Sequence, residues 1–337
     1  MASWARENWP GIFLALVSPT IAELLSGSTP ITVLFVSPLF FLIDFSGLVL
    51  LYGGGALLVR EAEVRWKKGW ASVLLLGAAY GIVEEGLAVH TFFQPGGKPV
   101  DALASFGRFG GVNVLWAVGL TVFHATISIA LPILLVELTY PETRGQSFLA
   151  TRGLWATAAG YVGIVILFAA AVPHLPSPDL AILFLAIVAA LVALARWAPR
   201  DLLRPRDGPP SAPWWAFGVA GATMMIDWVL LGLGGPALVR NAWWSGLLFV
   251  GILAADLAFL LRCAGTRDYR IAQFWFAAGM LGFFIVFWDV ILEIIAVPGI
   301  LLLSVGFGYY LYWLRKRLSP ADDPMPPAHV LGPAGPA

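Results

Sequence analysis

Charged side chains are scarce in this sequence, and their scarcity excludes an ordinary soluble domain. Asp, Glu, Lys and Arg make up 12% of the 337 residues, whereas hydrophobic residues make up 59%. A soluble domain carries about 25% charged residues. The sequence also lacks the short segments of alternating apolar and polar residues that a membrane β-barrel requires. Its apolar residues form runs of about 20 residues instead, which predicts an all-α, polytopic transmembrane helical bundle.

Cysteine, net charge and the motifs of soluble enzymes are lacking as well. The single cysteine, Cys263, excludes an intrachain disulfide and a thiolate metal cluster. A formal net charge of zero gives no indication of a nucleic-acid partner. No HExxH, GxxxxGK or GxSxG pattern occurs, and no lysine lies deep in an apolar run to form a retinal Schiff base. We therefore expect no cofactor, and the composition predicts the lipid bilayer as the partner.

Ten apolar segments can be drawn as membrane spans. They lie near residues 10–26, 38–59, 69–90, 111–139, 154–173, 179–197, 213–233, 243–262, 271–296 and 299–314. Residues 1–318 then form one transmembrane helical domain. Residues 319–337 are rich in Pro and Ala and are predicted to be a disordered cytoplasmic tail.

The distribution of basic residues predicts the orientation of the bundle. With ten spans and a cytoplasmic N-terminus, all of the 20 Lys and Arg residues except Lys98, Arg108 and Arg240 fall on the cytoplasmic side. Eight or nine spans would place a basic cluster on the outer side. We therefore predict that both termini are cytoplasmic. The preference for Arg over Lys, with frequent Ala, Gly and Trp, is typical of a GC-rich prokaryote, so the predicted location is the plasma membrane.

Two adjacent glutamates, Glu84 and Glu85, interrupt the apolar run 69–90. An ionisable side chain at membrane depth costs roughly 2.5–3.5 kcal/mol on insertion scales, and neighbouring carboxylates also repel each other. No Lys or Arg lies between Lys68 and Lys98 to pair with them. Such carboxyl groups stay protonated, bind a cation or line a hydrated cavity. The pair therefore predicts a buried acidic site in the outer half of the bundle.

A histidine on the next predicted span is the candidate partner of this pair. His124 lies in the middle of its span, and consecutive spans are usually neighbours, so Glu84 or Glu85 is expected to face it. The predicted catalytic group is therefore Glu84, Glu85 and His124. Six further polar residues, several of which share a helical face, form the predicted substrate or ion pathway: His90, Asn113, Thr121, Ser128, Asp289 and Glu293.

Each of these features also has a structural interpretation. A neutral His124 would hydrogen-bond between helices, and a protonated glutamate pair would do the same. Asp289 and Glu293, spaced i,i+4, would line or cap the outer interface. A divalent metal at Glu84, Glu85 and His124 fits the preference for oxygen and imidazole ligands, but a single histidine leaves metal binding open.

Three functions are compatible with these residues. A proton- or cation-coupled transporter would use carboxylates that no fixed cation neutralises. An intramembrane hydrolase would use Glu84 or Glu85 as a general base for water and His124 as a donor to the oxyanion, acting on a membrane-embedded peptide or lipid. A non-catalytic membrane scaffold would need none of this chemistry. The sequence leaves the substrate and the oligomeric state open.

Two resemblances accompany these residues. Glu84-Glu85 followed by His124 on the next span resembles the CAAX prenyl protease type II family of glutamate-type intramembrane proteases, which implies water activation by the glutamates and oxyanion stabilisation by histidine. Val89 stands where that family has arginine, and Leu120 where it has phenylalanine. The family's third motif, with a second histidine, has no counterpart, so that Asp289 or Glu293 would have to serve. The segments 19–30 and 80–93 also resemble an uncharacterised prokaryotic membrane-protein family.

Overall fold

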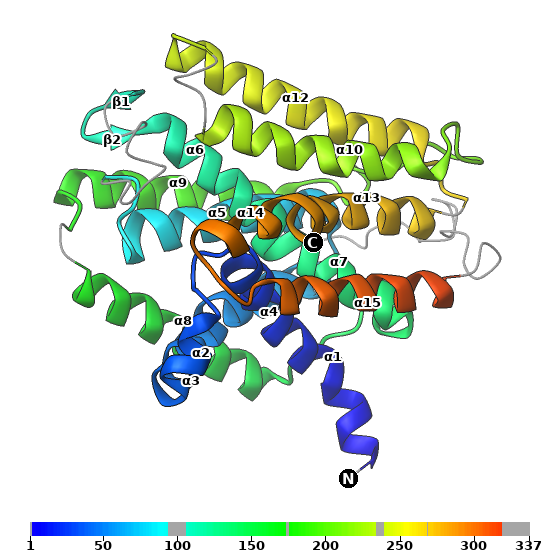
Figure 1. The fold of residues 1–337 in the computed structure, drawn as a ribbon, viewed down its shortest axis with the longest axis horizontal. Coiled ribbons are helices and arrows are strands. Elements are labelled where there is room, and N and C mark those ends of the chain that lie inside the picture. The colour runs from blue at the N-terminus through cyan, green and yellow to red at the C-terminus, as the bar shows by residue number, and fades with distance from the viewer. Residues whose placement is uncertain (1, 94–105, 173–174, 234–238, 268, 319–337) are drawn as a thin grey trace.

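The computed structural model describes residues 2–93, 106–172, 175–233, 239–267 and 269–318 and shows an almost entirely helical protein (Figure 1). Strand is limited, in these ranges, to the antiparallel pair β1 (Arg108–Phe109) and β2 (Val112–Asn113). Within the same ranges, eight helices are long and apolar enough to cross a membrane. The predicted all-α polytopic bundle is thus confirmed. The predicted tail at 319–337 lies outside the described residues.

The described residues in the first half of the chain form four long helical segments, and each segment contains a π-helical stretch. They are α1 (Ala2–Pro19) with η1 (Thr20–Leu25); α3 (Pro38–Leu48) with η2 (Val49–Gly53) and α4 (Gly54–Arg65), after the short α2 (Thr32–Val36); α5 (Trp70–Ile82) with η3 (Val83–Ala88); and α6 (Val114–Phe123) with η5 (His124–Ala130) and α7 (Leu131–Thr139).

The second half begins after the 3-10 turn η6 (Pro141–Thr143), and its described residues contain six helical segments. They are α8 (Thr151–Ala171); α9 (Pro178–Trp197); α10 (Trp214–Asp227) with η7 (Trp228–Leu233); α12 (Ala242–Cys263); α13 (Tyr269–Phe283) with η8 (Phe284–Trp288) and α14 (Asp289–Ile295); and α15 (Leu301–Arg317). The apolar helix Trp214–Leu230 is shorter than the eight candidate spans, and α15 has 17 residues. The ten-span count therefore stays a prediction.

The helices form an inner group and a peripheral group. Of the apolar window in Trp70–Ala88, 72% is buried inside the protein, compared with 6% for α8 and 11% for α9. Peripheral helices with exposed apolar side chains, such as Ile166 and Ile182, are expected when lipid rather than water surrounds the bundle. Helix α10 packs between α12 and α13 along one side of the molecule (Figure 1).

Glycines allow the inner helices to approach one another closely. A Cβ added to Gly53 would lie 2.8 Å from the Cα of Ala15 on α1, and still closer to the carbonyl oxygen of that residue. A Cβ at Gly55 would overlap the ring of Tyr80 on α5. The run of three glycines that the sequence places inside a span therefore serves close helix packing, which is a common use of small residues between membrane helices.

Basic side chains gather at one end of the bundle. Lys68, Arg144, Arg200 and Arg204 surround a chamber of about 310 Å³, which they share with Glu63, Glu137 and Asp201. These residues belong to the helix ends and loops that the positive-inside rule places in the cytoplasm. The side of the membrane that this end faces stays a prediction.

Candidate functional site

A cavity of about 530 Å³ lies among the inner helices, and the π-helical segments supply much of its wall. All six π-helical segments in the described ranges contribute at least one lining residue. The contributions are Glu23 from η1, Leu51 and Tyr52 from η2, Glu84 and Glu85 from η3, His124 from η5, Trp228 from η7, and Phe284 and Trp288 from η8. A π-turn holds an extra residue and turns the side chains that follow it, and it occurs frequently at functional sites.

A proline lies at the border of two of these π-helical segments: Pro19 immediately precedes η1, and Pro132 lies just after η5. Proline has no N–H, and so it cannot bond the carbonyl four residues earlier. Pro132 thereby frees the carbonyl of Ser128, which accepts a hydrogen bond of 2.6 Å from the Ser18 hydroxyl of α1. Pro19 likewise leaves the carbonyl of Ala15 without its usual helical donor, at the point where η2 approaches. The hydrogen bond from Ser18 to Ser128 therefore joins the two proline-bearing helices beside the cavity.

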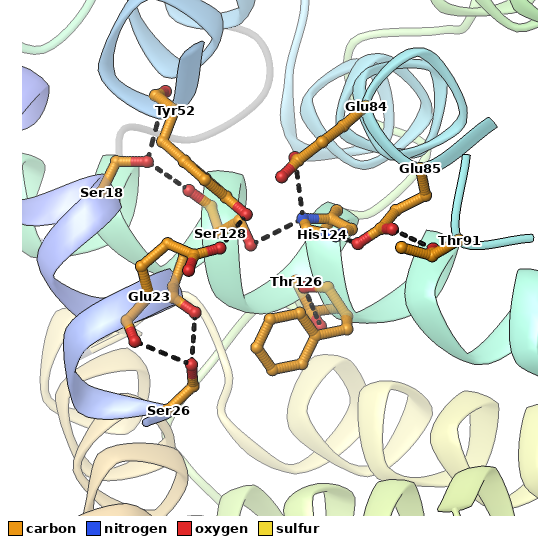
Figure 2. A network of polar contacts seen from close by, with 12 residues as sticks. Ser18, Glu23, Ser26, Tyr52, Glu84, Glu85, Thr91, His124, Thr126 and Ser128 are labelled. Atoms are coloured by element: carbon orange, nitrogen blue, oxygen red, sulfur yellow. Dashed lines mark hydrogen bonds and ion pairs between the residues drawn. The ribbon is translucent and has the colours of Figure 1, made fainter. Parts of the chain in front are cut away.

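His124 lies between the two glutamates at the centre of the site (Figure 2). Its Nε2 is 2.8 Å from Oε1 of Glu85, and its Nδ1 is 3.3 Å from Oε2 of Glu84. The exposed fractions are 2% for Glu84, 7% for Glu85 and 2% for His124, so water screens these contacts poorly. The structure thus brings together the three residues that the sequence predicts as the catalytic group.

A network of hydroxyl groups extends from this centre. The Ser128 hydroxyl is 3.0 Å from Nδ1 of His124, and the Thr91 hydroxyl donates to Oε2 of Glu85. On the opposite wall, the Tyr52 hydroxyl donates to Oε1 of Glu23 at 2.5 Å. Thr29 donates to the other oxygen of Glu23 at 2.8 Å. Figure 2 shows Glu23 and Tyr52 on one side of this network and Glu84, Glu85, His124 and Ser128 on the other. All of these residues belong to the first 130 positions, so the N-terminal half of the chain builds the polar centre.

The cavity wall carries acidic side chains and one histidine. Glu23, Asp44, Glu84 and Glu85 line it, together with His124. No Lys or Arg lines it in the part of the chain that the structure describes. A cavity whose titratable groups are carboxyls and one imidazole favours a proton or another cation over an anion.

Three residues of the predicted pathway, His90, Asn113 and Thr121, are absent from the wall of the cavity. His90 is buried in the left-handed backbone region (φ 60°), and its Nε2 is 3.1 Å from the carbonyl of Leu87. Asn113 caps α6, where its Oδ1 accepts from the backbone N–H of Trp116 at 3.0 Å. Thr121 lines a separate apolar cavity of about 440 Å³. Ser128 alone among the four predicted residues of this region contacts the acidic centre, through His124.

The structure places Asp289 and Glu293 apart from the glutamate pair. The Ser304 hydroxyl of α15 donates to Oδ2 of Asp289 at 2.6 Å. Glu293 accepts from the backbone N–H groups of Gly299, at 2.9 Å, and Leu301, at 3.2 Å. Glu293 thus caps the turn between α14 and α15, and Asp289 joins the start of α14 to α15.

Two residues that contact each other in the cavity wall were not part of the predicted site. Glu23 carries a signal in the sequence, because it is another acid within an apolar segment. Tyr52 carries none, since a tyrosine in an apolar run is also typical of ordinary packing. Their contact joins residues 29 positions apart on different helices.

The central group also has the composition of a metal site. One ligand atom from each of Glu84, Glu85 and His124 can be chosen so that all lie within 4.8 Å of one another. Carboxylate oxygen with imidazole nitrogen suits several divalent ions. Both nitrogens of His124 already face carboxylate oxygens, however, so a metal ion would have to displace one of these contacts.

Comparison with known proteins places the chain in a family without assigning a function. Val89 and Leu120, at the positions where the CAAX proteases have arginine and phenylalanine, both line the cavity. No curated protein and no solved structure matches the chain. A model described as an uncharacterized membrane protein family matches residues 12–286, a range that includes Glu23, the glutamate pair and His124. The chain belongs to this uncharacterized membrane protein family.

Proposed function

We propose that the protein is a proton-coupled cation transporter of the prokaryotic plasma membrane, in which Glu84, Glu85 and His124 bind the coupling proton. One observation carries the proposal. Four carboxyl groups and one imidazole converge on a single cavity, and no Lys or Arg of the described residues lines that cavity. Protonation of Asp or Glu neutralises such a site within the membrane and thereby changes its affinity for a cation.

The hydrogen-bond inventory of His124 supports proton binding. A neutral imidazole donates through one nitrogen only, whereas both nitrogens of His124 face carboxylate oxygens at 2.8 and 3.3 Å. A neutral imidazole could donate to Glu85 through Nε2 and accept from the Ser128 hydroxyl at Nδ1, but Nδ1 would then present a lone pair to Oε2 of Glu84. Favourable contacts with both glutamates therefore call for an imidazolium ion or a proton on one of the glutamates. The three groups share protons as a unit, and the arrival of a cation beside them favours the release of one.

The lining of the cavity favours a binding role over a purely structural acidic cluster. The structure also contains an apolar cavity of about 440 Å³, so volume alone does not distinguish the two interpretations. A scaffold that used Glu84 and His124 only to join two helices would not require the further carboxyl groups of Glu23 and Asp44 in the same wall.

Proton release on cation addition tests the proposal. The chain is reconstituted in liposomes that contain a pH-sensitive dye and an acidic interior, and a panel of inorganic and organic cations is added outside. We expect at least one cation to drive proton efflux through the wild type. The double variant Glu84→Gln, Glu85→Gln keeps the side-chain shape and is expected to abolish this flux.

The matched control is Asp256→Asn, which removes a carboxylate on α12 that is absent from the cavity wall. This variant is expected to retain the wild-type flux. Equal flux through the wild type and the double glutamine variant would exclude the proposal.

A second candidate function has one observation in its favour. Among the described residues, buried Oε2 of Glu84 accepts no hydrogen bond and has only the 3.3 Å ion-pair contact with Nδ1 of His124, so it can still accept a hydrogen bond from a water molecule. That water would be the nucleophile of a glutamate-type intramembrane hydrolase. The structure offers a weaker candidate for the group that donates to the oxyanion, because both nitrogens of His124 already face carboxylate oxygens. Incubation with membrane-embedded peptides and phospholipids in ¹⁸O water, followed by mass spectrometry, distinguishes the two: hydrolysis labels a product that Glu84→Gln would not form.

A further inference from the structure

Aromatic side chains share the cavity with the carboxylates. Glu84, Glu85 and Glu23 lie in the N-terminal half of the chain, whereas the tryptophans come from several helices. The aromatic residues on which the argument depends are Trp116, Trp228, Trp288, Phe123, Phe168 and Phe284. Aromatic faces attract cations, and most strongly those of tryptophan.

Two of the tryptophan rings are held in place by their own hydrogen bonds. Nε1 of Trp228 donates to the carbonyl of Gly119 at 3.1 Å, and Nε1 of Trp288 donates to the carbonyl of Ser26 at 3.0 Å. The ring of Trp228 also packs against that of Phe123, with 4.7 Å between their centroids. Rings that are fixed before a ligand arrives lose little side-chain entropy when it binds.

The dimensions and wall of the cavity do not match a bare inorganic ion. Hard metal ions are bound in small cages of oxygen ligands at about 2.0–2.6 Å. The cavity has about 530 Å³, and aromatic and aliphatic side chains line it together with the carboxyl groups. Pockets of about 300–1,000 Å³ with apolar walls and a few convergent polar groups are typical of organic ligands.

We infer that the cavity binds an organic cation with a bulky apolar body, whose positive charge faces the carboxylates and whose body lies against Trp228 and Trp288. This inference names the substrate class and so rests on the proposed transport function. Charge selects a cation over an anion, while the fixed aromatic rings select an apolar body over a hydrated metal ion. The charged centre would replace the proton that the carboxylates share with His124.

Equilibrium binding of two probes of similar shape and opposite charge tests the inference. The full chain in lipid nanodiscs is dialysed against tetraphenylphosphonium or tetraphenylborate, and the uptake by empty nanodiscs is subtracted. We expect saturable binding of the cation and none of the anion. Trp228→Leu is expected to weaken cation binding about tenfold, because it removes an aromatic face that packs against the phenyl groups of the probe. Trp228→Phe keeps an aromatic face and is expected to restore most of the affinity.

The control is Trp155→Leu, which removes an exposed tryptophan on the lipid-facing surface of α8 and should leave binding unchanged. Trp288→Leu provides the same test on a different helix if the first variant does not yield folded protein. The inference is overturned if both probes bind alike, or if a folded leucine variant at either tryptophan binds the cation as the wild type does.

The binding and flux assays distinguish a failure of the proposed ligand class from a failure of the proposed transport function. Cation binding in nanodiscs without any coupled proton efflux in liposomes would support the ligand class and remove the transport function. Proton efflux driven by inorganic cations alone, without phosphonium binding, would support transport and overturn the ligand class.

Discussion

Gly53 offers a sharp test of the inner packing, because the neighbouring glycine provides its control. A Cβ at Gly53 would lie 2.8 Å from the Cα of Ala15, whereas the nearest atom to a Cβ at Gly54 is 3.8 Å away, on Tyr161. The two glycines are consecutive and helical, so Gly→Ala gains about 1 kcal/mol of helix propensity at either position. Only Gly53→Ala places the added methyl group against the backbone of another helix, at Ala15.

The expected difference follows from these distances. Overpacking a close-packed contact costs about 1–3 kcal/mol, and more where backbone has to move. Gly54→Ala is therefore expected to be neutral or to stabilise the protein by up to about 1 kcal/mol. The free energy of unfolding of Gly53→Ala is expected to be about 1–3 kcal/mol lower than that of Gly54→Ala.

The measurement is the apparent melting temperature of the detergent-purified variants, compared at one heating rate because unfolding of such proteins is commonly irreversible. Gly53→Ala should melt several degrees below Gly54→Ala. It should also weaken coupled proton flux, since the displaced α1 carries Ser18 and leads directly to Glu23, the acceptor of the Tyr52 hydroxyl. Equal melting temperatures for the two variants would refute the close approach of α1 and η2.

Three further substitutions have expected outcomes. Arg60→Lys loses the stacking of a buried guanidinium on Phe148 and its two hydrogen bonds to the carbonyls of Thr143 and Gln146. The apparent melting temperature should therefore fall by an amount that corresponds to about 1–3 kcal/mol. Ser304→Ala removes the hydroxyl that donates to buried Asp289 and should lower stability by about 1–3 kcal/mol while cation-driven flux persists. Tyr52→Phe should reduce flux with little change in melting temperature; unchanged flux would contradict a role for this hydroxyl.

The sequence was sufficient for the helical segments because the bilayer imposes strong rules. Each apolar run must satisfy its own backbone groups, and so runs of about 20 residues become helices. The contact between Glu84, Glu85 and His124 was predictable for a related reason, since consecutive membrane helices are usually neighbours. That argument needs only the order of spans and the depth of each residue.

Helix ends and long-range contacts were not predictable in the same way. Asp289 and Glu293 share a helical face, but α14 ends at Ile295 and leaves the chain turning at Gly299, where φ is +92°. Backbone N–H groups at the start of the next helix need acceptors in a membrane, and Glu293 supplies one. The spacing of apolar residues along the sequence does not predict where a helix ends and the chain turns in this way.

The π-helical segments explain how a membrane chain can build a polar cavity at all. A loop at this depth would leave backbone groups without partners, at several kcal/mol each. A π-turn keeps its N–H groups bonded to carbonyls five residues earlier, yet it rotates the side chains that follow. Glu23, Tyr52, the glutamate pair and His124 all lie in such segments. Their convergence therefore depends on backbone geometry that residue spacing in a regular helix does not reveal, which is why the sequence predicts the central pair but not the opposite wall.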